Sequence, residues 1–274
     1  MTMSSAPTAA QGTQDGQDFE DIEIIAHRGE SADAPENTLA AFNLAWERNL
    51  PGIELDVHMT GDGQVIVCHD ANTKRTTGVS QEIKEATLAD LQTLDAGSWK
   101  DARWTGEKLP TLSDSLATIP TRTRCFLEIK TGPEAVPAVA AAVTAANLAP
   151  DQIAIISFYP ETLAEAKRQL PQNKAYFLSS FKQDTATGEW TPTAGDLIAK
   201  ARSLGADGLD LNYKGPIDAD FVKQVKAAGL ELYVWTIDET EPAQRMVEAG
   251  VDGITSNRAD WLRGELRRVR GAGK

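Results

Sequence analysis

The segment Ile53–Asp70 reads IELDVHMTGDGQVIVCHD and predicts two β-strands joined by a tight turn. Its first half alternates, so Glu54, Asp56 and His58 leave one face of a strand while the apolar residues between them leave the other. Gly-Asp-Gly then interrupts the run, and residues 65–67 resume it. Gly-Asp-Gly between two β-rich runs is typical of a hairpin.

This hairpin gathers charged side chains on a small area of sheet. A fold about residues 61 and 62 brings His69 roughly opposite Glu54, so that two acids and two histidines share one patch. Like charges at neighbouring positions on one face repel each other and destabilise a purely structural strand. A divalent cation between the carboxylates removes that repulsion. The segment therefore predicts a metal site.

Length and composition indicate one large soluble domain. The chain has 274 residues, of which 41% are hydrophobic. No run of 18 apolar residues is present, so we expect no integral membrane segment. Residues 1–20 lack the basic start and apolar centre of a signal peptide and are predicted to be a disordered tail before a single domain over residues 21–270. The protein is then expected to be cytoplasmic, unless a cleaved leader preceded this sequence.

The formal net charge of −13 belongs mainly to the domain, because the acids of the tail are offset by arginines near the C-terminus. An acidic body argues against nucleic acid or an anionic membrane surface as the main partner. An anionic substrate would therefore need local positive charge from a metal, an arginine or a lysine. Cys68 and Cys125 lie in apolar strand contexts and are predicted to be reduced core thiols.

The rest of the chain alternates between predicted strands and helices. A short strand over Asp21–Ala26 is followed by a helix that starts at Asn37 or Thr38. Three later helices end at a glycine, which adopts the left-handed conformation that lets the chain leave a helix. Setting aside the returning hairpin strand, the predicted strands begin near residues 22, 53, 125, 153, 174, 206, 231 and 251.

Eight parallel strands alternating with helices predict a distorted TIM (β/α)8 barrel, with the hairpin and a small insertion after the second strand. The insertion covers about residues 70–110 and has poor periodicity; connections of about 40 residues are usually functional. Functional residues of this fold gather at the carboxyl ends of the strands. Polar residues at those ends include His27, Arg28, Glu54, Asp56, Glu128, Lys130, Trp235 and Asn257.

Three carboxylates, Glu54, Asp56 and Glu128, are expected to converge from adjacent strands. Without thiolates they form a hard oxygen site suited to one divalent cation, Mg²⁺ or Ca²⁺, rather than to zinc.

Two histidines and two cations complete this set. His27 and His69 can act as an acid/base pair, one taking a proton from water and the other giving a proton to a leaving oxygen. Arg28 and Lys130 supply the positive charge that a phosphate requires. Together with a metal that offsets charge on phosphoryl oxygens, these groups suggest cleavage of a phosphodiester.

An ordered series of short motifs runs along residues 22–260. The motifs are His27-Arg28-Gly29, Pro35-Glu36-Asn37-Thr38, Glu54-Leu55-Asp56-Val57, Thr60-Gly61-Asp62-Gly63, His69-Asp70, Arg75-Thr76-Thr77-Gly78, Asp95-Ala96-Gly97-Ser98-Trp99, Leu109-Pro110-Thr111-Leu112, Leu127-Glu128-Ile129-Lys130 and Val234-Trp235-Thr236. No single motif is decisive, but the ordered set resembles the glycerophosphodiester phosphodiesterase family.

This resemblance implies a distorted TIM barrel that hydrolyses a small-molecule glycerophosphodiester to glycerol 3-phosphate and an alcohol, with a bound divalent cation. It assigns the acid/base pair to His27 and His69 and the phosphate contacts to Arg28 and Lys130. Some members of the family act on lysophospholipids, and the motifs do not specify the leaving group. The metal ligands that it implies are Glu54, Asp56 and Glu128.

Several residues keep two interpretations. Trp235 could pack in the core, but we expect it to line the substrate pocket for the glycerol or the leaving group. Glu36 could be an acid favoured at a helix start by the helix dipole, or a residue near the metal or substrate. His58 could contact substrate or only the protein. Glu128 and Lys130 could form a simple strand-end ion pair.

Two other classes of function stay open. An isomerase or aldolase acting on sugar phosphates would use the metal, but it leaves the paired histidines and the hairpin without a purpose. A non-catalytic binding protein would not need His27 and His69. The head group, the choice between Mg²⁺ and Ca²⁺ and the oligomeric state are not specified by these motifs.

Overall fold

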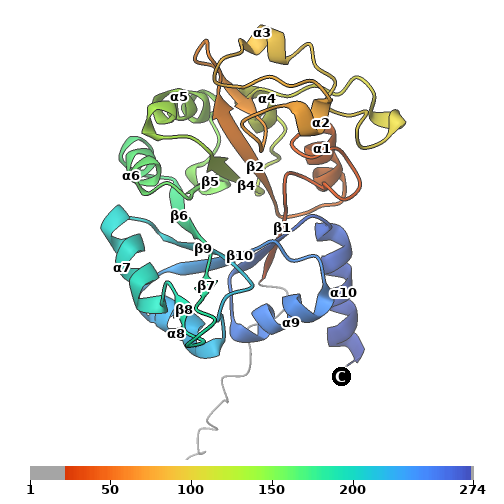
Figure 1. Cartoon of the computed structure of the whole chain (residues 1–274). Coiled ribbons are helices and arrows are strands. Elements are labelled where there is room, and N and C mark those ends of the chain that lie inside the picture. The colour runs from red at the N-terminus through yellow and green to blue at the C-terminus, as the bar shows by residue number, and fades with distance from the viewer. Residues whose placement is uncertain (1–21, 273–274) are drawn as a thin grey trace, which may run out of the picture.

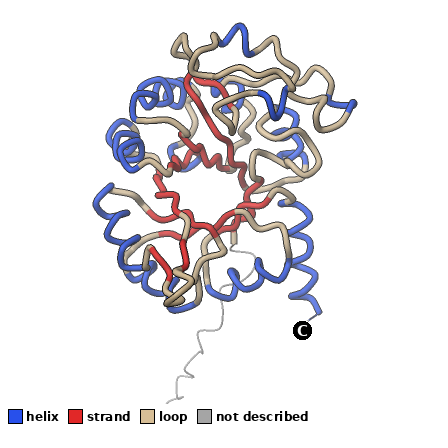
Figure 2. Tube along the Cα trace, viewed as in Figure 1, coloured by secondary structure: helices blue, strands red, loops and turns tan. Residues whose placement is uncertain are grey.

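The computed structural model describes residues 22–272, and its central feature is a closed ring of parallel strands surrounded by helices (Figures 1 and 2). The predicted disordered tail over residues 1–20 lies outside the described residues. In order around the ring, the strands are β1 (Glu23–Ala26), β2 (Gly52–Met59), β4 (Arg124–Ile129), β5 (Ile153–Ser157), β6 (Lys174–Ser179), β9 (Gly208–Asn212), β10 (Glu231–Trp235) and β11 (Gly253–Ser256).

Each ring strand pairs in parallel with its neighbours, and β11 returns to β1, so the barrel is closed and the predicted TIM barrel is confirmed. The longer helices that cover the ring are α1 (Leu39–Glu47), α4 (Leu112–Leu116), α5 (Val136–Ala145), α6 (Pro160–Gln169), α7 (Ala194–Leu204), α8 (Ala219–Ala227), α9 (Thr240–Ala249) and α10 (Ala259–Ala272). Among residues 22–272, no helix combines the length and the apolar composition of a membrane span.

Short elements decorate this repeat. The returning hairpin strand is β3 (Val65–Val67), and a second small hairpin, β7 (Lys182–Gln183) with β8 (Trp190–Thr191), precedes α7. The remaining short helices are α2 (Lys74–Thr77), α3 (Leu88–Leu91), η1 (Ala102–Trp104), η2 (Pro133–Ala135) and η3 (Pro150–Gln152).

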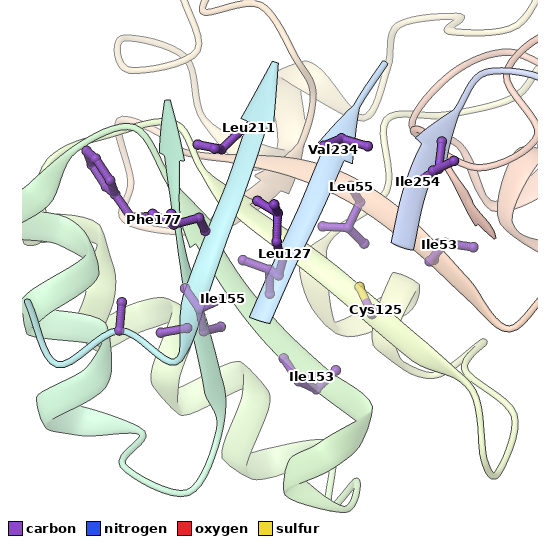
Figure 3. Packing of buried hydrophobic residues seen from close by; sticks show 14 of the residues in the cluster. Ile53, Leu55, Cys125, Leu127, Ile153, Ile155, Phe177, Leu211, Val234 and Ile254 are labelled. Atoms are coloured by element: carbon purple, nitrogen blue, oxygen red, sulfur yellow. The ribbon is translucent and has the colours of Figure 1, made fainter. Parts of the chain in front are cut away.

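Alternation along the barrel strands separates two apolar layers. Leu55, Leu127 and Leu211 point out of the ring toward the helices, as Figure 3 shows for this cluster. The intervening positions point inward, where Phe126 and Tyr176 stack with their ring centroids 5.8 Å apart. Closer to the carboxyl ends of the strands, several inward-facing positions carry polar side chains instead.

Both cysteines are buried free thiols, as predicted. Cys125 packs between the ring and the helices, whereas Cys68 belongs to a small separate core under the insertion. That core explains how a segment of poor periodicity keeps a defined shape beside the hairpin (Figure 1). Its buried residues are Ile66, Cys68, Ile83, Leu91, Leu94, Ala96 and Leu109.

The hairpin forms, but its register differs by one residue from the prediction. β3 runs antiparallel to β2 and places Val67 opposite Val57. Extended by the same register, the position opposite Glu54 is Asp70, so the predicted pairing of His69 with Glu54 is wrong. His69 instead follows the end of β3 in a loop.

The shift arises in the turn. The Thr60 N–H donates to the Gln64 carbonyl, so three residues rather than two form the loop. The third of them, Gly63, has φ +78°, the left-handed conformation that three-residue hairpin loops favour. A Gly-Asp-Gly sequence is compatible with either loop length, and here the position of the second glycine decides the register.

Two valines, one buried in the outer layer and one exposed in the insertion, provide a matched test of the packing. Val139 on α5 is fully buried, whereas Val79 in the insertion is 47% exposed. We expect Val139→Ala to lower the free energy of unfolding by about 2 kcal/mol, because transfer and cavity terms add. Val79→Ala should change it by less than about 0.5 kcal/mol. Urea denaturation followed by circular dichroism measures both, and equal losses would contradict this layering.

Candidate active site

A cavity of about 100 Å³ lies at the carboxyl ends of the barrel strands. One side of its wall is charged, and the other is apolar, where the rings of Phe158 and Trp235 meet edge to face with centroids 5.6 Å apart. The lining residues are His27, Arg28, Glu54, His69, Glu128, Lys130, Ile156, Phe158, Leu178, Asp210, Trp235, Thr236 and Thr255. Seven of the eight predicted site residues therefore line one cavity, and Asp56 lies buried directly against them.

Three carboxylates meet in this wall. β2 and β4 are neighbours, and their register sets Asp56 beside Glu128, while Glu54 leaves the same face of β2 two residues earlier. Ligand oxygens of these three residues all lie within 4.8 Å of one another, and all three residues are buried. The sequence prediction that these acids converge is confirmed by this geometry.

The three acids differ in their electrostatic surroundings. Burial, followed by the negative charge of Asp56, raises the pKa of Glu54 well above its usual range and that of Glu128 to about 7. Burial alone would also raise the pKa of Asp56, but Arg28 and then Lys130 hold it well below its usual range. Asp56 is therefore the member of the triad whose charged form its surroundings favour most.

Asp56 is surrounded by donors from three elements. Arg28 Nε lies 3.3 Å and Lys130 Nζ 3.4 Å from its carboxylate, and Asn37 Nδ2 donates to Oδ2 at 2.8 Å. Asn37 takes φ +57°, and its Oδ1 also accepts the Asp56 N–H at 3.3 Å. Oδ1 of Asp56, whose ion-pair partner Lys130 Nζ lies 3.4 Å away, accepts no hydrogen bond among the described residues. A buried carboxylate oxygen of this kind, beside two further carboxylates, fits a hard divalent cation.

The backbone after β1 also serves the triad. Arg28 has φ +57°, a conformation that costs a side chain roughly 1–2 kcal/mol, and its N–H donates to Glu54 Oε2 at 2.9 Å. Gly29 follows with φ +77°, and a Cβ there would lie 2.6 Å from the backbone of Ala41. The His-Arg-Gly motif therefore contains glycine because the first helix passes too close for any other residue.

His27 is oriented by residues at the opposite end of the sequence. Its Nδ1 lies 2.7 Å from Asn257 Oδ1, and Asn257 Nδ2 donates to Asp238 Oδ2 at 2.7 Å. Since the amide uses its donor on Asp238, its oxygen accepts the Nδ1 proton and leaves Nε2 as the basic nitrogen. Burial, followed by the charge of Arg28, lowers the pKa of His27 to about 4. The sequence placed Asn257 at a strand end without a role, and it gave no signal for Asp238.

His69 is held by a chain of charges that crosses the insertion. Its Nδ1 lies 2.6 Å from Asp70 Oδ1, and Arg75 Nε donates to Asp70 Oδ2 at 2.7 Å. Arg75 also donates to Glu36 at 2.8 Å, and Arg28 Nη1 donates to Glu36 Oε1 at 2.8 Å. The insertion is thus tied to both His69 and Arg28. The Arg-Thr-Thr-Gly motif was a signal for Arg75, but its sequence did not reveal this role.

The residues with two interpretations differ in whether they line the cavity. Glu36 pairs with two arginines and does not belong to the carboxylate triad. His58 Nε2 lies 3.1 Å from the His69 carbonyl, so it contacts the backbone of the loop rather than the cavity. Lys130 does form a strand-end ion pair with Glu128 at 3.0 Å, and it also lines the cavity. Trp235 lines the apolar wall, as expected.

Asp210 is a cavity residue that sequence reasoning missed. It lies in the middle of β9, is only 2% exposed, and its Oδ1 has no hydrogen-bond partner among the described residues. Burial, followed by the charge of Glu128, raises its pKa well above the usual range. Leu209 and Leu211 flank it in an apolar run, and this alternation was the available signal for an inward-facing acid.

Comparison with known proteins decides the family. Residues 27–261 match the model of the glycerophosphoryl diester phosphodiesterase family. The chain belongs to this family. It is therefore an enzyme that hydrolyses phosphodiesters, and the alternative of an isomerase or aldolase is wrong.

Relatives and solved structures support the same assignment. A glycerophosphodiester phosphodiesterase of Caldanaerobacter subterraneus is 34% identical over 244 residues, covering 87% of this chain and 95% of that protein. One of Bacillus subtilis is 31% identical over 256 residues, covering 87% and 84%. Among structures, an Oleispira antarctica phosphodiesterase in complex with the product sn-glycerol-3-phosphate has a TM-score of 0.79 at 28% identity, covering 89% of this chain and 96% of that one.

The surroundings of His27 predict its protonation. We expect ¹⁵N NMR of the metal-free protein to show a neutral His27 ring at pH 7 with the proton on Nδ1, titrating near pH 4. The unfolded chain binds this proton near the ordinary pKa of about 6.5. Between these values the unfolded state holds more protons at His27, so acidification through this window lowers stability.

The variant Asn257→Asp supplies the control. A carboxylate in place of the amide oxygen would stabilise the imidazolium and raise the pKa of His27. A native His27 that titrates near 6.5, or that carries its proton on Nε2, would contradict the proposed orientation.

Proposed function

We propose that this enzyme hydrolyses glycerophosphodiesters to glycerol 3-phosphate and an alcohol, with a divalent cation and with histidine acid/base catalysis. The carrying observation is that both histidines, both cations and the buried carboxylates surround one small cavity. The product sn-glycerol-3-phosphate bound to the related Oleispira phosphodiesterase supports the choice of product.

Glu54, Asp56 and Glu128 would hold the cation, Mg²⁺ or Ca²⁺, since their donors are all carboxylate oxygens. When bound, the cation supplies Lewis-acid chemistry that offsets negative charge on phosphoryl oxygens. It also balances the like charges that burial makes costly in this triad.

The charged wall orients the phosphate. Arg28 and Lys130 line the cavity and present cationic groups, and their carboxylate partners fix where those groups lie. Fixed positive charge in a buried site stabilises a phosphoryl transition state without reorganisation.

The two histidines would divide the proton transfers. His27 keeps Nε2 unprotonated at neutral pH, because its partner Asn257 is a neutral amide and its pKa is lowered. It is thus suited to take a proton from the nucleophile, either water or the substrate's own 2-hydroxyl. His69 has the Asp70 carboxylate behind it, which can balance the charge of an imidazolium that donates to the leaving alkoxide.

A turnover assay tests the function directly. The protein is incubated with glycerophosphocholine or glycerophosphoethanolamine in Mg²⁺, Ca²⁺ or EDTA, and released glycerol 3-phosphate is coupled to its dehydrogenase. We expect release that depends on the cation and stops with EDTA. Cation binding without release from either substrate would contradict the proposed substrate class.

Substitution of each histidine by asparagine tests the acid/base pair. We expect His27→Asn and His69→Asn to lower kcat by about 10²–10⁴-fold, the usual contribution of a general acid or base. The matched change His58→Asn removes only a contact to the backbone and should cost less than about 10-fold, the scale of one neutral hydrogen bond. Near-normal kcat for either cavity variant, with native circular dichroism, would refute the assignment.

Cation binding can be measured without turnover. We expect Mg²⁺ or Ca²⁺ to raise the melting temperature, adding about 2.7 kcal/mol of stability at a concentration 100 times Kd. Glu128→Gln should weaken this response, because it replaces one of the three carboxylates by a neutral amide. Glu248→Gln, on the exposed face of α9, serves as the matched control and should leave it unchanged. Equal responses from both variants would place the cation elsewhere.

A further inference from the structure

Asp210 is an acid within the cavity that the catalytic scheme does not use. It lies between Leu209 and Leu211, which face the helices, so its side chain faces the interior of the barrel. In the sheet it is paired with Leu178 on β6 and with Tyr233 on β10. It therefore belongs to the deep part of the apolar wall.

The Asp210 carboxyl group has an oxygen that no described residue satisfies. Oδ1 is buried without a hydrogen-bond partner among the described residues, although the Asp210 carbonyl accepts from Trp235 Nε1 at 3.1 Å. The cations of the cavity are engaged elsewhere: Arg28 pairs with Glu36 and Asp56, and Lys130 with Glu128 and Asp56. A buried polar oxygen without a partner is costly, and a donor on a ligand in this cavity would offset that cost.

The depth of Asp210 in the cavity indicates which part of a substrate it can contact. Asp210 is 2% exposed, whereas Phe158, across the same apolar wall, is 39% exposed at the mouth. The deep end of a cavity of about 100 Å³ can hold a compact group only. Of the two arms of a glycerophosphodiester, the glycerol is compact and constant and carries hydroxyl donors, while the alcohol varies in size.

We propose that Asp210 accepts a hydrogen bond from the terminal hydroxyl of the substrate's glycerol and so restricts the enzyme to substrates in which this hydroxyl is free. The inference rests on the proposed function and adds a specificity-determining residue to it. A lysophospholipid acylated at that hydroxyl has no donor to offer there, and its chain does not fit the deep end. The alcohol then extends past Phe158 toward solvent.

The test compares two substrates that differ by one hydroxyl. Glycerophosphocholine carries the terminal hydroxyl; 2-hydroxypropyl phosphocholine lacks it but keeps the 2-hydroxyl and the choline. For the native enzyme we expect kcat/KM to be about 10- to 100-fold higher for glycerophosphocholine, the range for leaving a buried acceptor without its hydrogen-bond partner, and no measurable turnover of lysophosphatidylcholine.

In the variant Asp210→Leu, kcat/KM for glycerophosphocholine should fall by this factor of about 10- to 100-fold, while kcat/KM for 2-hydroxypropyl phosphocholine stays native. The ratio of the two kcat/KM values then falls to about 1. Asp210→Asn retains an acceptor oxygen and should restore part of the ratio. Melting temperatures identify any variant that fails to fold, and the isosteric asparagine variant then carries the test. Equal losses on both substrates would indicate a merely structural role and overturn the inference.

A third substrate tests whether Asp210 instead pairs with the cationic head group of the substrate. The methyl ester of glycerol 3-phosphate keeps the glycerol but has no ammonium. If Asp210→Leu costs nothing on this ester, the carboxylate recognises the head group and the inference is wrong. If the native enzyme hydrolyses none of these diesters, the proposed function itself is wrong. If the native enzyme hydrolyses them but Asp210→Leu leaves the ratio of the two kcat/KM values unchanged, only the role of Asp210 is wrong.

Discussion

Repulsion among three buried carboxylates is the constraint on which the arrangement of this barrel mouth depends. Asp56 is 1% exposed and lies beside Glu54 and Glu128, a cluster that no apolar core would tolerate without compensation. The protein compensates from several directions. Arg28 and Lys130 approach Asp56 as cations, and Asn37 contributes an amide donor.

The compensating groups in turn impose conformations on the chain. Arg28 and Asn37 both adopt positive φ, which costs energy that the surrounding contacts must offset. The chain of ion pairs from Arg28 through Glu36 and Arg75 extends the same charge balance to the insertion. The insertion is therefore part of the active site's electrostatics, not a loop attached to a completed barrel.

The cavity that results has two chemically distinct walls. The charged wall carries cations and acids suited to a phosphodiester, and the histidine rings are fixed by partners on their Nδ1 atoms. The apolar wall carries Phe158 and Trp235, with Asp210 as its single unsatisfied acid among the described residues. With two such walls, a site can hold a reacting phosphate in place on the charged side. The apolar side can then discriminate between the groups attached to that phosphate.

The barrel and the composition of its charged wall could be predicted from the order of the amino acids alone. Alternation along Ile53–Met59 fixes which side chains share a face, and in a parallel barrel the inward face at the carboxyl ends is one site, so Glu54, Asp56 and Glu128 had to converge. Local patterns carry this information because strand period and helix ends depend on neighbouring residues.

Contacts between segments far apart in the chain could not be predicted in this way, because folding of the whole ring sets them. The hairpin register depended on which glycine took the left-handed conformation, and this moved His69 by one position. The pairing of His27 with Asn257, 230 residues away, depends on barrel closure, which sets β11 beside β1. The lack of a hydrogen-bond partner for Asp210 Oδ1 among the described residues likewise depends on which side chains the barrel brings near it. Such contacts join residues whose separation in sequence carries no periodic signal, because their distance is set by the packing of the whole ring.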